Sequence, residues 1–418
     1  MASLYKKGAK RFLVLVGLAM LLLAVPLVYA AVEAPTGFDD HTNGLTSQNR
    51  FTLDREIFEE REGIADGLGP VYNAQSCAEC HQNPVSGSDS QIEEIRVGRF
   101  DGTTFTNRPG GSLINDRAID PRIQERVEAA DNVRTLRVSL NLLGDGFVEA
   151  IPDSEFTRIR NAQPAGMKGT IIRVPVLEAP GTKAIGRFGW KNQHASLISF
   201  SADAYLNEMG ITNPLFPQEN TSNGRSVAAF DPLPETNGFL EDEATSAHPF
   251  GVDVEIFARF IRATEAPAPA SDDDDIGISA SPEERISGKF LFRSTGCINC
   301  HTDEITTAPE GTVINGGTFT VPAALGEKII HPFGDFMLHD VGTGDGIVQA
   351  GGQETRNLIR TAPLWGLRTR TRLMHDGKNL TIQDAILRHT NEAEPVIQSY
   401  RSLTAGEKNQ LLAFLLSL

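Results

Sequence analysis

The clearest periodic pattern of apolar and polar positions lies near the C-terminus. Three apolar residues and a histidine follow the i, i+3, i+4 and i+7 spacing of one helix face: Ile382, Ala385, Ile386 and His389. Thr381 opens a segment of capping-box form, which predicts the start of the helix. The pattern therefore predicts a helix that carries His389 on its apolar face. A second helix is expected to start at Thr404 and to bury Phe414 with its neighbouring leucines.

Three other stretches of the chain have different sequence patterns. Ser281 and Pro282 precede two acidic residues, which predicts a further helix leading toward Cys297. Residues 133–190 alternate or run apolar in short pieces between Gly-rich turns, and we expect a β-containing elaboration there. Residues 265–282 combine a Pro/Ala stretch with an acidic run, which predicts a linker; that run could bind calcium, but four consecutive acids are more often only solvated.

The first 30 residues have the layout of a secretory signal. Four cations precede an apolar run from Phe12 to Val28, and a small-residue cleavage site ends at Ala30. The run approaches the ~20 residues that span a bilayer, so an uncleaved membrane anchor is the alternative. Pro26 favours cleavage, and we expect a protein exported to the periplasm.

The rest of the chain is strongly acidic. The formal charge of the whole sequence is -16, and removal of the four signal cations would take it to about -20. This charge disfavours binding to nucleic acid or to anionic lipid. It suits a basic partner, such as a small cationic electron carrier, and it equally suits plain solubility.

All four cysteines lie in two C-x-x-C-H motifs. The motifs are Cys77, Cys80 and His81 in the first copy and Cys297, Cys300 and His301 in the second. At this spacing two thiols can add to the two vinyl groups of one haem, and the imidazole that follows can bind the iron. Zinc binding or dithiol redox chemistry is the alternative. Two copies, each followed by histidine and with no cysteine to spare, favour two covalently bound haems c.

The two motifs lie on opposite sides of the predicted linker. We therefore expect a mainly α fold with two cytochrome c-like haem domains, the first of them with the β-containing insertion. The expected divisions are a signal peptide at 1–30, an N-terminal haem domain at 31–264, a linker at 265–282 and a C-terminal haem domain at 283–418.

Several segments carry a resemblance to a known family. They are residues 186–191, 208–212, 335–340, 362–367 and 373–377. Across nearly the whole chain after residue 30, the sequence resembles the peroxidase-like di-haem oxidoreductases, which are related to bacterial di-haem cytochrome c peroxidases and to MauG. The resemblance implies an oxidoreductase that passes electrons between an external donor or acceptor protein, a six-coordinate haem and a reactive haem, with a small-molecule oxidant as a candidate substrate.

The resemblance also implies ligands. His389 stands where the peroxidases have a distal methionine and MauG a tyrosine, so His301 and His389 would both bind the iron of the second haem. Met337 and Met374 are the competing sulfur ligands. Related enzymes bind one calcium ion between their domains, and Asn73 is a ligand candidate here.

Glu208 matches a glutamate that lies over the peroxidatic haem in the resembling peroxidases. If the segment is helical, one stripe contains His194, Leu197, Ser201, Ala204 and Glu208. A carboxylate there could take a proton from a peroxide and return it; alternatively, Glu208 caps a loop or pairs with Arg187. His194 could be a second ligand of the first haem or a distal base. Either tryptophan, Trp190 or Trp365, could relay electrons between the haems or simply fill the core.

The candidate functions differ in the coordination of the haem iron that they require. An enzyme needs one haem with an exchangeable position, and an electron carrier needs none. We expect an open first haem with Glu208 beside it and a closed second haem. The alternatives are a non-catalytic di-haem electron-transfer protein and a redox partner subunit of a dehydrogenase.

Overall fold

The computed structural model describes residues 30–235, 239–271, 274, 276–278 and 280–418. The predicted signal peptide therefore lies outside the described residues except for Ala30, and so do four positions of the predicted linker. Residues 31–418 form one compact unit. In the ranges that are described, no helix has the length and apolar character needed to cross a membrane.

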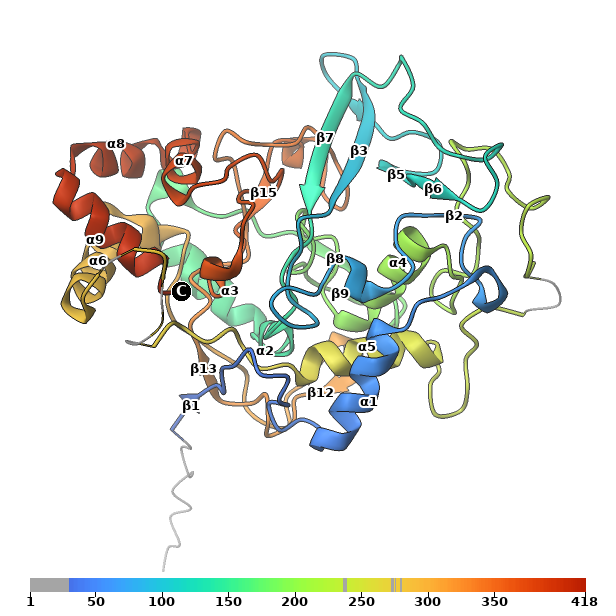
Figure 1. Cartoon of the computed structure of the whole chain (residues 1–418), viewed down its shortest axis with the longest axis horizontal. Helices are drawn as coiled ribbons and strands as arrows, with labels where there is room; N and C mark the ends of the chain where they lie inside the picture. The colour runs from blue at the N-terminus through green and yellow to red at the C-terminus, as the bar shows by residue number, and fades with distance from the viewer. Residues whose placement is uncertain (1–29, 236–238, 272–273, 275, 279) are drawn as a thin grey trace, which may run out of the picture. The chain divides into compact units, whose positions relative to one another are not determined.

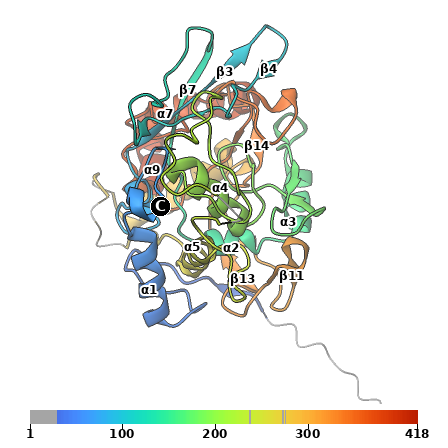
Figure 2. The same cartoon turned by 90° about the vertical axis from the view of Figure 1, so that its right-hand side faces the viewer.

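The described helices are spread along the whole chain. They are α1 (Gln48–Glu59), α2 (Asp145–Glu149), α3 (Asp153–Ala162), α4 (Leu197–Met209), α5 (Val252–Ala263), α6 (Pro282–Thr295), α7 (Ile382–Leu387), α8 (Glu394–Ser402) and α9 (Ala405–Leu415). In Figure 1, α6, α7, α8 and α9 gather on one side of the molecule, and α1, α4 and α5 on the other. Figure 2, turned toward this second side, places α4 and α5 in front.

The strands are short, and most pair locally. They are β1 (Val32–Glu33), β2 (Val71–Tyr72), β3 (Glu93–Phe100), β4 (Phe105–Thr106), β5 (Leu113–Ile114), β6 (Arg117–Ala118), β7 (Val133–Val138), β8 (Arg173–Pro175), β9 (Lys183–Ile185), β10 (Ile305–Thr306), β11 (Val313–Ile314), β12 (Phe319–Thr320), β13 (Lys328–Ile330), β14 (Leu338–His339) and β15 (Ile359–Arg360). The longest ladder is antiparallel and joins β3 to β7, from Glu93↔Val138 to Gly98↔Val133. On its other edge β3 pairs with β4 and β5.

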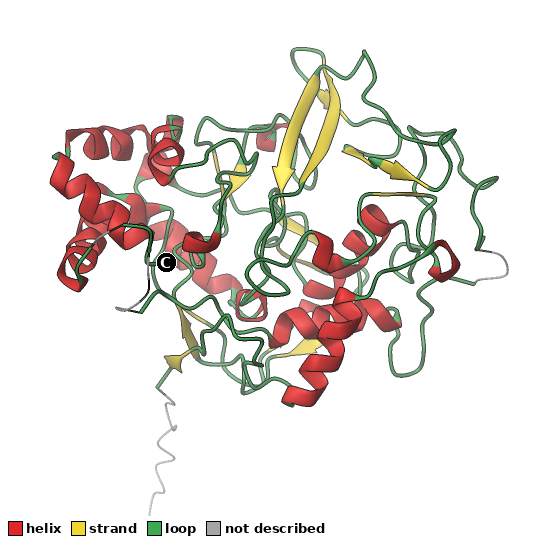
Figure 3. Ribbon diagram, in the orientation of Figure 1, coloured by secondary structure: helices red, strands yellow, loops and turns green. Residues whose placement is uncertain are grey.

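The prediction of a mainly α fold with two cytochrome c-like domains is wrong. Only 30% of the chain is helical and 15% is strand, and irregular segments connect the elements, as Figure 3 shows. The composition gives the physical reason: 39 glycines and 23 prolines interrupt the stretches between the predicted helices. The predicted β elaboration corresponds to β7, β8 and β9, but α2 and α3 lie among them.

Apolar residues from both halves of the chain share the largest buried cluster. It includes Phe58, Phe147, Leu197, Phe260, Leu325, Phe336 and Trp365. Strand β1, near the start of the described chain, pairs in parallel with β13, so the backbone also connects the two halves. A smaller cluster surrounds Phe292, Phe333 and Phe414. The domain boundaries at 264 and 283 stay predictions.

The helix starts that the sequence predicted are confirmed. Ser281 accepts a hydrogen bond from the backbone of Glu284 and opens a capping box at α6, and Thr404 does the same for α9. Thr381 caps α7, but this helix ends at Leu387. His389 therefore follows the helix instead of lying on its face.

Helix α6 provides a matched pair of phenylalanines for a test of this packing. Phe292 is 2% exposed and packs edge-to-face against Phe333 and Phe414, whereas Phe290 is 70% exposed. We expect Phe292→Ala to lower the free energy of unfolding by about 3–5 kcal/mol, because it opens a cavity in the core. Phe290→Ala should change it by about 0.5 kcal/mol or less. Denaturant unfolding of the haem-loaded protein measures both, and equal losses would contradict the packing described here.

Candidate functional site

Each C-x-x-C-H motif forms a 3-10 turn. The first turn spans Cys77–Glu79 and the second Cys297–Asn299. His81 donates its backbone N–H to the Cys77 carbonyl over 3.1 Å, and His301 donates to Cys297 over 3.0 Å. With three residues per turn, the two cysteines of a motif lie on the same side of the turn. The backbone thus gives both motifs one geometry.

Helix pairs support the two turns in the same way. Phe58 of α1 lies 6.5 Å from the His81 ring, and Phe292 of α6 lies 6.3 Å from the His301 ring. Helix α1 packs on α5, where Phe58 meets Phe260 at 4.7 Å, and α6 packs on α9. One apolar ring behind each imidazole restricts how that imidazole can turn.

The thiols of the two motifs are poorly suited to dithiol chemistry. All four are free, and burial raises the pKa of Cys77 and Cys297 well above the usual value. Burial, followed by the charge of Glu208, raises the pKa of Cys80 to about 12. Since the thiolate is the redox nucleophile, the raised pKa values of Cys77, Cys80 and Cys297 disfavour dithiol chemistry.

Three histidines share a hydrogen-bond pattern that is typical of iron ligands. Nδ1 of His81 donates to the Ser88 carbonyl (3.1 Å), Nδ1 of His301 to Phe333 (2.9 Å) and Nδ1 of His389 to Ala385 (2.8 Å). Because a carbonyl oxygen can only accept, Nε2 is left as the unprotonated atom, which can bind a metal. Burial lowers the pKa of all three imidazoles, to about 4 for His81 and His301.

Three other described histidines, His331, His339 and His375, differ from this pattern. His331 also bonds a carbonyl through Nδ1, but its Nε2 contacts Glu33 at 3.0 Å. His339 faces a carboxylate on each side. Nδ1 of His375 has no hydrogen-bond partner among the described residues. Hydrogen bonding therefore separates the three predicted ligands from these three histidines.

A cavity of about 190 Å³ lies beside the second motif. Cys297, Cys300, His301 and His389 line it together, although nearly 90 residues separate the first three from the last. Of the competing sulfur ligands, Met374 lines the cavity, whereas Met337 is buried in the large apolar cluster. The structure thus brings the predicted attachment residues and both predicted histidine ligands of the second site to one space.

Buried arginine nitrogens without hydrogen-bond partners show whether a haem fits this cavity. Arg360 and Arg370 line it, and their buried Nε atoms, with Nη2 of Arg370, have no hydrogen-bond partner within the described part of the chain. Such groups are costly unless an acceptor satisfies them. Most of the remaining lining is apolar, including Phe292, Leu367 and Ile386. A flat apolar ring with two carboxylates matches these walls, so the residues present fit a haem.

Near the first motif, Glu208 belongs to a group of charged residues. Its Oε2 accepts from Nδ2 of Asn73 (2.9 Å), and its Oε1 lies 4.0 Å from Arg96. Arg96 holds Glu94 through two bonds of 2.5 and 3.2 Å. Burial and then Glu94 raise the pKa of Glu208 to about 8. Burial also acts to raise the pKa of Glu94, but Arg96 together with Arg137 lowers it overall. Glu208 is consequently a neutral acid next to an ionised one.

The structure excludes one of the sequence-based alternatives for Glu208, the pairing with Arg187. Its backbone carbonyl accepts from Asn73 and Ala74, while Arg187 bonds carbonyls of α2 and Asp153 instead of Glu208. Asn73, the calcium candidate, uses both ends of its amide, since its Oδ1 also accepts from the Asp116 backbone. Pairing of Glu208 with Arg187 is therefore wrong.

His194 lies outside the helix that the sequence predicted for it. Helix α4 begins at Leu197 with Ser196 as its cap, so the stripe from His194 to Glu208 is not one helix face. His194 is 6% exposed, and its Nε2 lies 3.1 Å from Asp203. The charge of Asp203 acts on Arg96, which connects His194 to the Glu208 group indirectly. Its catalytic role stays a prediction.

The two tryptophans have different surroundings. Trp190 lines the cavity, donates from Nε1 to the Val138 carbonyl (2.8 Å) and lies 6.1 Å from the His375 ring. Trp365 is buried in the large cluster, and its Nε1 has no partner among the residues described. Only Trp190 of the two lines this cavity.

Sequence reasoning missed several residues of these sites. Glu94 and Arg96 lie two apart on β3, so alternation along a strand would have placed them on one face. No comparable signal marked Arg360 and Arg370, because Arg360 belongs to the two-residue strand β15 and Arg370 lies outside the helices and strands, where the sequence has no period to detect.

Comparison with known proteins agrees with this geometry. The model of the family described as "Di-haem oxidoreductase, putative peroxidase" matches residues 115–418, so the chain belongs to that family, whose name implies two haems. The match contains the second motif and starts after the first. Among curated proteins, none is significantly similar to this chain.

Solved structures with a partly similar arrangement include three proteins. Hydrazine synthase from Kuenenia stuttgartiensis is 13% identical, with a TM-score of 0.40 and 100% and 99% of the two chains covered. A MauG-like protein associated with microbial copper homeostasis is 15% identical, with a TM-score of 0.40 and 94% of each chain covered. A variant of the diheme peroxidase BthA from Burkholderia thailandensis is 14% identical, with a TM-score of 0.37 and 93% and 91% covered.

The orphaned Arg370 leads to a prediction about the second haem. A cation beside a haem stabilises its reduced, less positive form, so we expect Arg370→Leu to lower the reduction potential of that haem. Arg368→Leu is the matched control, because Arg368 donates to the Leu418 carbonyl and is not among the cavity lining residues. Potentiometric titration measures both variants. An unchanged potential in Arg370→Leu would contradict the assignment of this cavity to a haem.

Proposed function

We propose that the protein is a periplasmic di-haem c-type oxidoreductase with peroxidase-like activity. The two motifs hold two haems covalently, the first through Cys77 and Cys80 and the second through Cys297 and Cys300. The first haem is the reactive one, with one histidine ligand, His81. The second is six-coordinate.

One observation carries this proposal: among the described residues, the two equivalent turns have different neighbours. His389 lines the cavity of the second motif and presents its Nε2 in the same hydrogen-bonded state as His301. Beside the first motif, the group close to Cys80 is Glu208, a neutral acid. This asymmetry supports one closed site that stores electrons and one site with room for a substrate.

Bound haem supplies a redox-active iron that can exchange electrons with a partner and with an oxidant. The chain supplies the proton. Glu208 keeps its proton because burial and the charge of Glu94 disfavour the ionised form of this side chain. The amide of Asn73 donates a hydrogen bond to Oε2 and so holds the carboxyl group in place. From that position Glu208 can donate to the departing oxygen of a peroxide and accept a proton in return.

The remaining features of the proposal concern partners and location. The acidic surface suits a basic electron-donor or acceptor protein, and the N-terminal 30 residues suit export. A calcium ion is proposed only by family resemblance. The alternatives, an electron-transfer protein or a redox partner of a dehydrogenase, would leave Glu208 without a catalytic role.

Replacement of Glu208 tests the enzymatic proposal. We expect Glu208→Gln to lower peroxide turnover with an artificial electron donor by about 10²–10⁴-fold, because general acid–base assistance is lost. Turnover by the unaltered protein should fall as pH rises through about 8, where Glu208 loses its proton, and the variant should lack that decline.

The matched control is Glu62→Gln. Glu62 is another carboxyl whose burial raises its pKa, to about 7, and its charge acts on Cys77 of the same motif, but it bonds Tyr205 instead of the Glu208 group. This variant should keep its turnover. Unchanged turnover in Glu208→Gln, with unchanged haem absorption, would remove Glu208 from the mechanism.

A further inference from the structure

A buried ion-pair network lies beside the second haem site, at residues to which the proposed function gives no role. His339 is 1% exposed and contacts Asp335 through Nε2 (2.9 Å) and Glu392 through Nδ1 (2.7 Å). Carboxylates accept and do not donate, so both ring nitrogens carry hydrogens and the imidazole is a cation. Burial lowers the pKa of His339, but Asp335, followed by Cys300 and Glu392, outweighs this effect and raises it to about 12.

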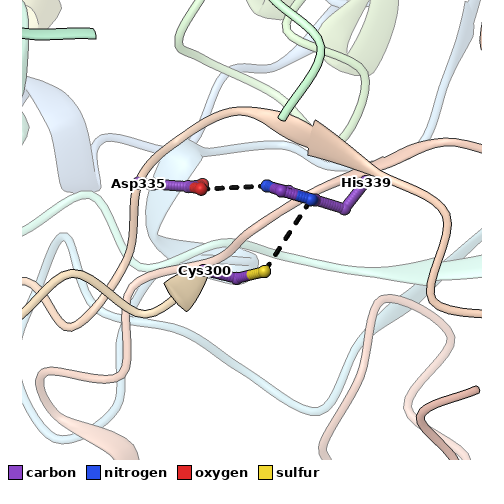
Figure 4. A group of neighbouring side chains, drawn as sticks. All are labelled: Cys300, Asp335 and His339. Carbon is purple, nitrogen blue, oxygen red and sulfur yellow. Dashed lines mark hydrogen bonds and ion pairs between the residues drawn. The ribbon is translucent and has the colours of Figure 1, made fainter. Parts of the chain in front are cut away.

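Cys300 makes a metal ion an alternative occupant of this network. Cys300, Asp335 and His339 present ligand atoms within 4.8 Å of one another, and Figure 4 shows the imidazole between the carboxylate and the sulfur. Both nitrogens of His339 already donate to carboxylates, and the sulfur belongs to the proposed haem attachment. The network therefore fits a structural role toward the haem better than a metal site.

On one side, the network reaches the turn that attaches the haem. Nε2 of Gln163 donates both to Asp335 (2.6 Å) and to the backbone carbonyl of Asn299 (2.8 Å), inside the second motif. The sulfur of Cys300 lies 3.8 Å from Nδ1 of His339. These contacts connect the His339 cation to the part of the chain that carries His301.

On the other side, the network reaches the loop that carries His389. The second carboxylate oxygen of Glu392 accepts from the Asp340 backbone (3.0 Å), and Glu392 donates its own N–H to the Asp340 carbonyl (3.1 Å). Thr390, the neighbour of His389, donates to the Val341 carbonyl (3.0 Å). Residues 339–341 and 390–392 thus form a clip, and its centre is the pair of His339 and Glu392.

We propose that Asp335, His339 and Glu392 act as a clamp that positions His389 as the second ligand of the second haem. The clamp sets the spacing between the turn of His301 and the loop of His389, because it bonds both segments. These are positioning residues and do not touch the iron. The inference rests on the proposed function, since it assumes that His301 and His389 bind one haem.

Cyanide uptake by the haem-loaded ferric protein tests the clamp. The unaltered protein should bind one equivalent of potassium cyanide, at the open first haem. Glu392→Ala removes both bonds of that carboxylate, and it should bind two equivalents because His389 no longer holds its position. Added imidazole should restore the low-spin signal of the second haem in this variant, and near-UV circular dichroism equal to that of the unaltered protein should show that its fold is kept.

The matched control is Glu394→Ala, two residues farther along. Glu394 pairs with Arg401 at 3.9 Å on the surface, and this variant should bind one equivalent. Glu392→Gln keeps the size of the side chain and one acceptor, so it is a milder variant that can be used if Glu392→Ala does not fold. It should also bind a second equivalent of cyanide, more weakly than Glu392→Ala does. One equivalent in both Glu392 variants would overturn the clamp alone, whereas two equivalents in the unaltered protein would overturn the six-coordinate second haem and the clamp with it.

Discussion

A hydrogen bond from an imidazole Nδ1 to a backbone carbonyl is the constraint on which both sites depend. It recurs at His81, His301 and His389, with acceptors in three separate segments. The bond fixes the tautomer and the direction of Nε2, so the position of each acceptor carbonyl decides where a metal can be held. Much of the irregular chain around the motifs therefore has a function: its loops place single carbonyl groups.

The two sites share this constraint and differ in what faces them. The second motif meets a loop that brings His389 and the clamp of His339, whereas the first meets the end of α4 with Glu208. The difference lies outside the two motifs, which have matching turns and matching phenylalanines. Equivalent attachment geometry can therefore support two unequal sites when different segments cover them.

The sequence predicted the local features and missed the long-range ones. The motifs and the helix starts at Ser281 and Thr404 follow from spacings of a few residues, whereas the approach of His389 to the second motif was implied by the resemblance. The family also followed from short segments. The fold class could not be predicted, because pairings such as β1 with β13 join strands of two or three residues that have no period to detect.

The long-range contacts of charged residues at the two haem sites could not be predicted from the sequence either. Glu208 was identified from a resemblance, but its neutral state depends on Glu94 and Arg96, which reach it from a strand more than 100 residues earlier. Arg370 belongs to a loop between the two sites and interacts with Asp89, the neighbour of the carbonyl that holds His81. Such groups gain their roles only when the chain folds, since no local pattern places a buried charge beside its partner.

The most direct test of one open and one closed haem is low-temperature EPR of the ferric protein, recorded with and without cyanide. The account predicts one high-spin signal that becomes low-spin on cyanide binding, and one low-spin signal that cyanide leaves unchanged. Two low-spin signals that are both indifferent to cyanide, in oxidised and half-reduced samples alike, would contradict the account and would make the protein an electron carrier.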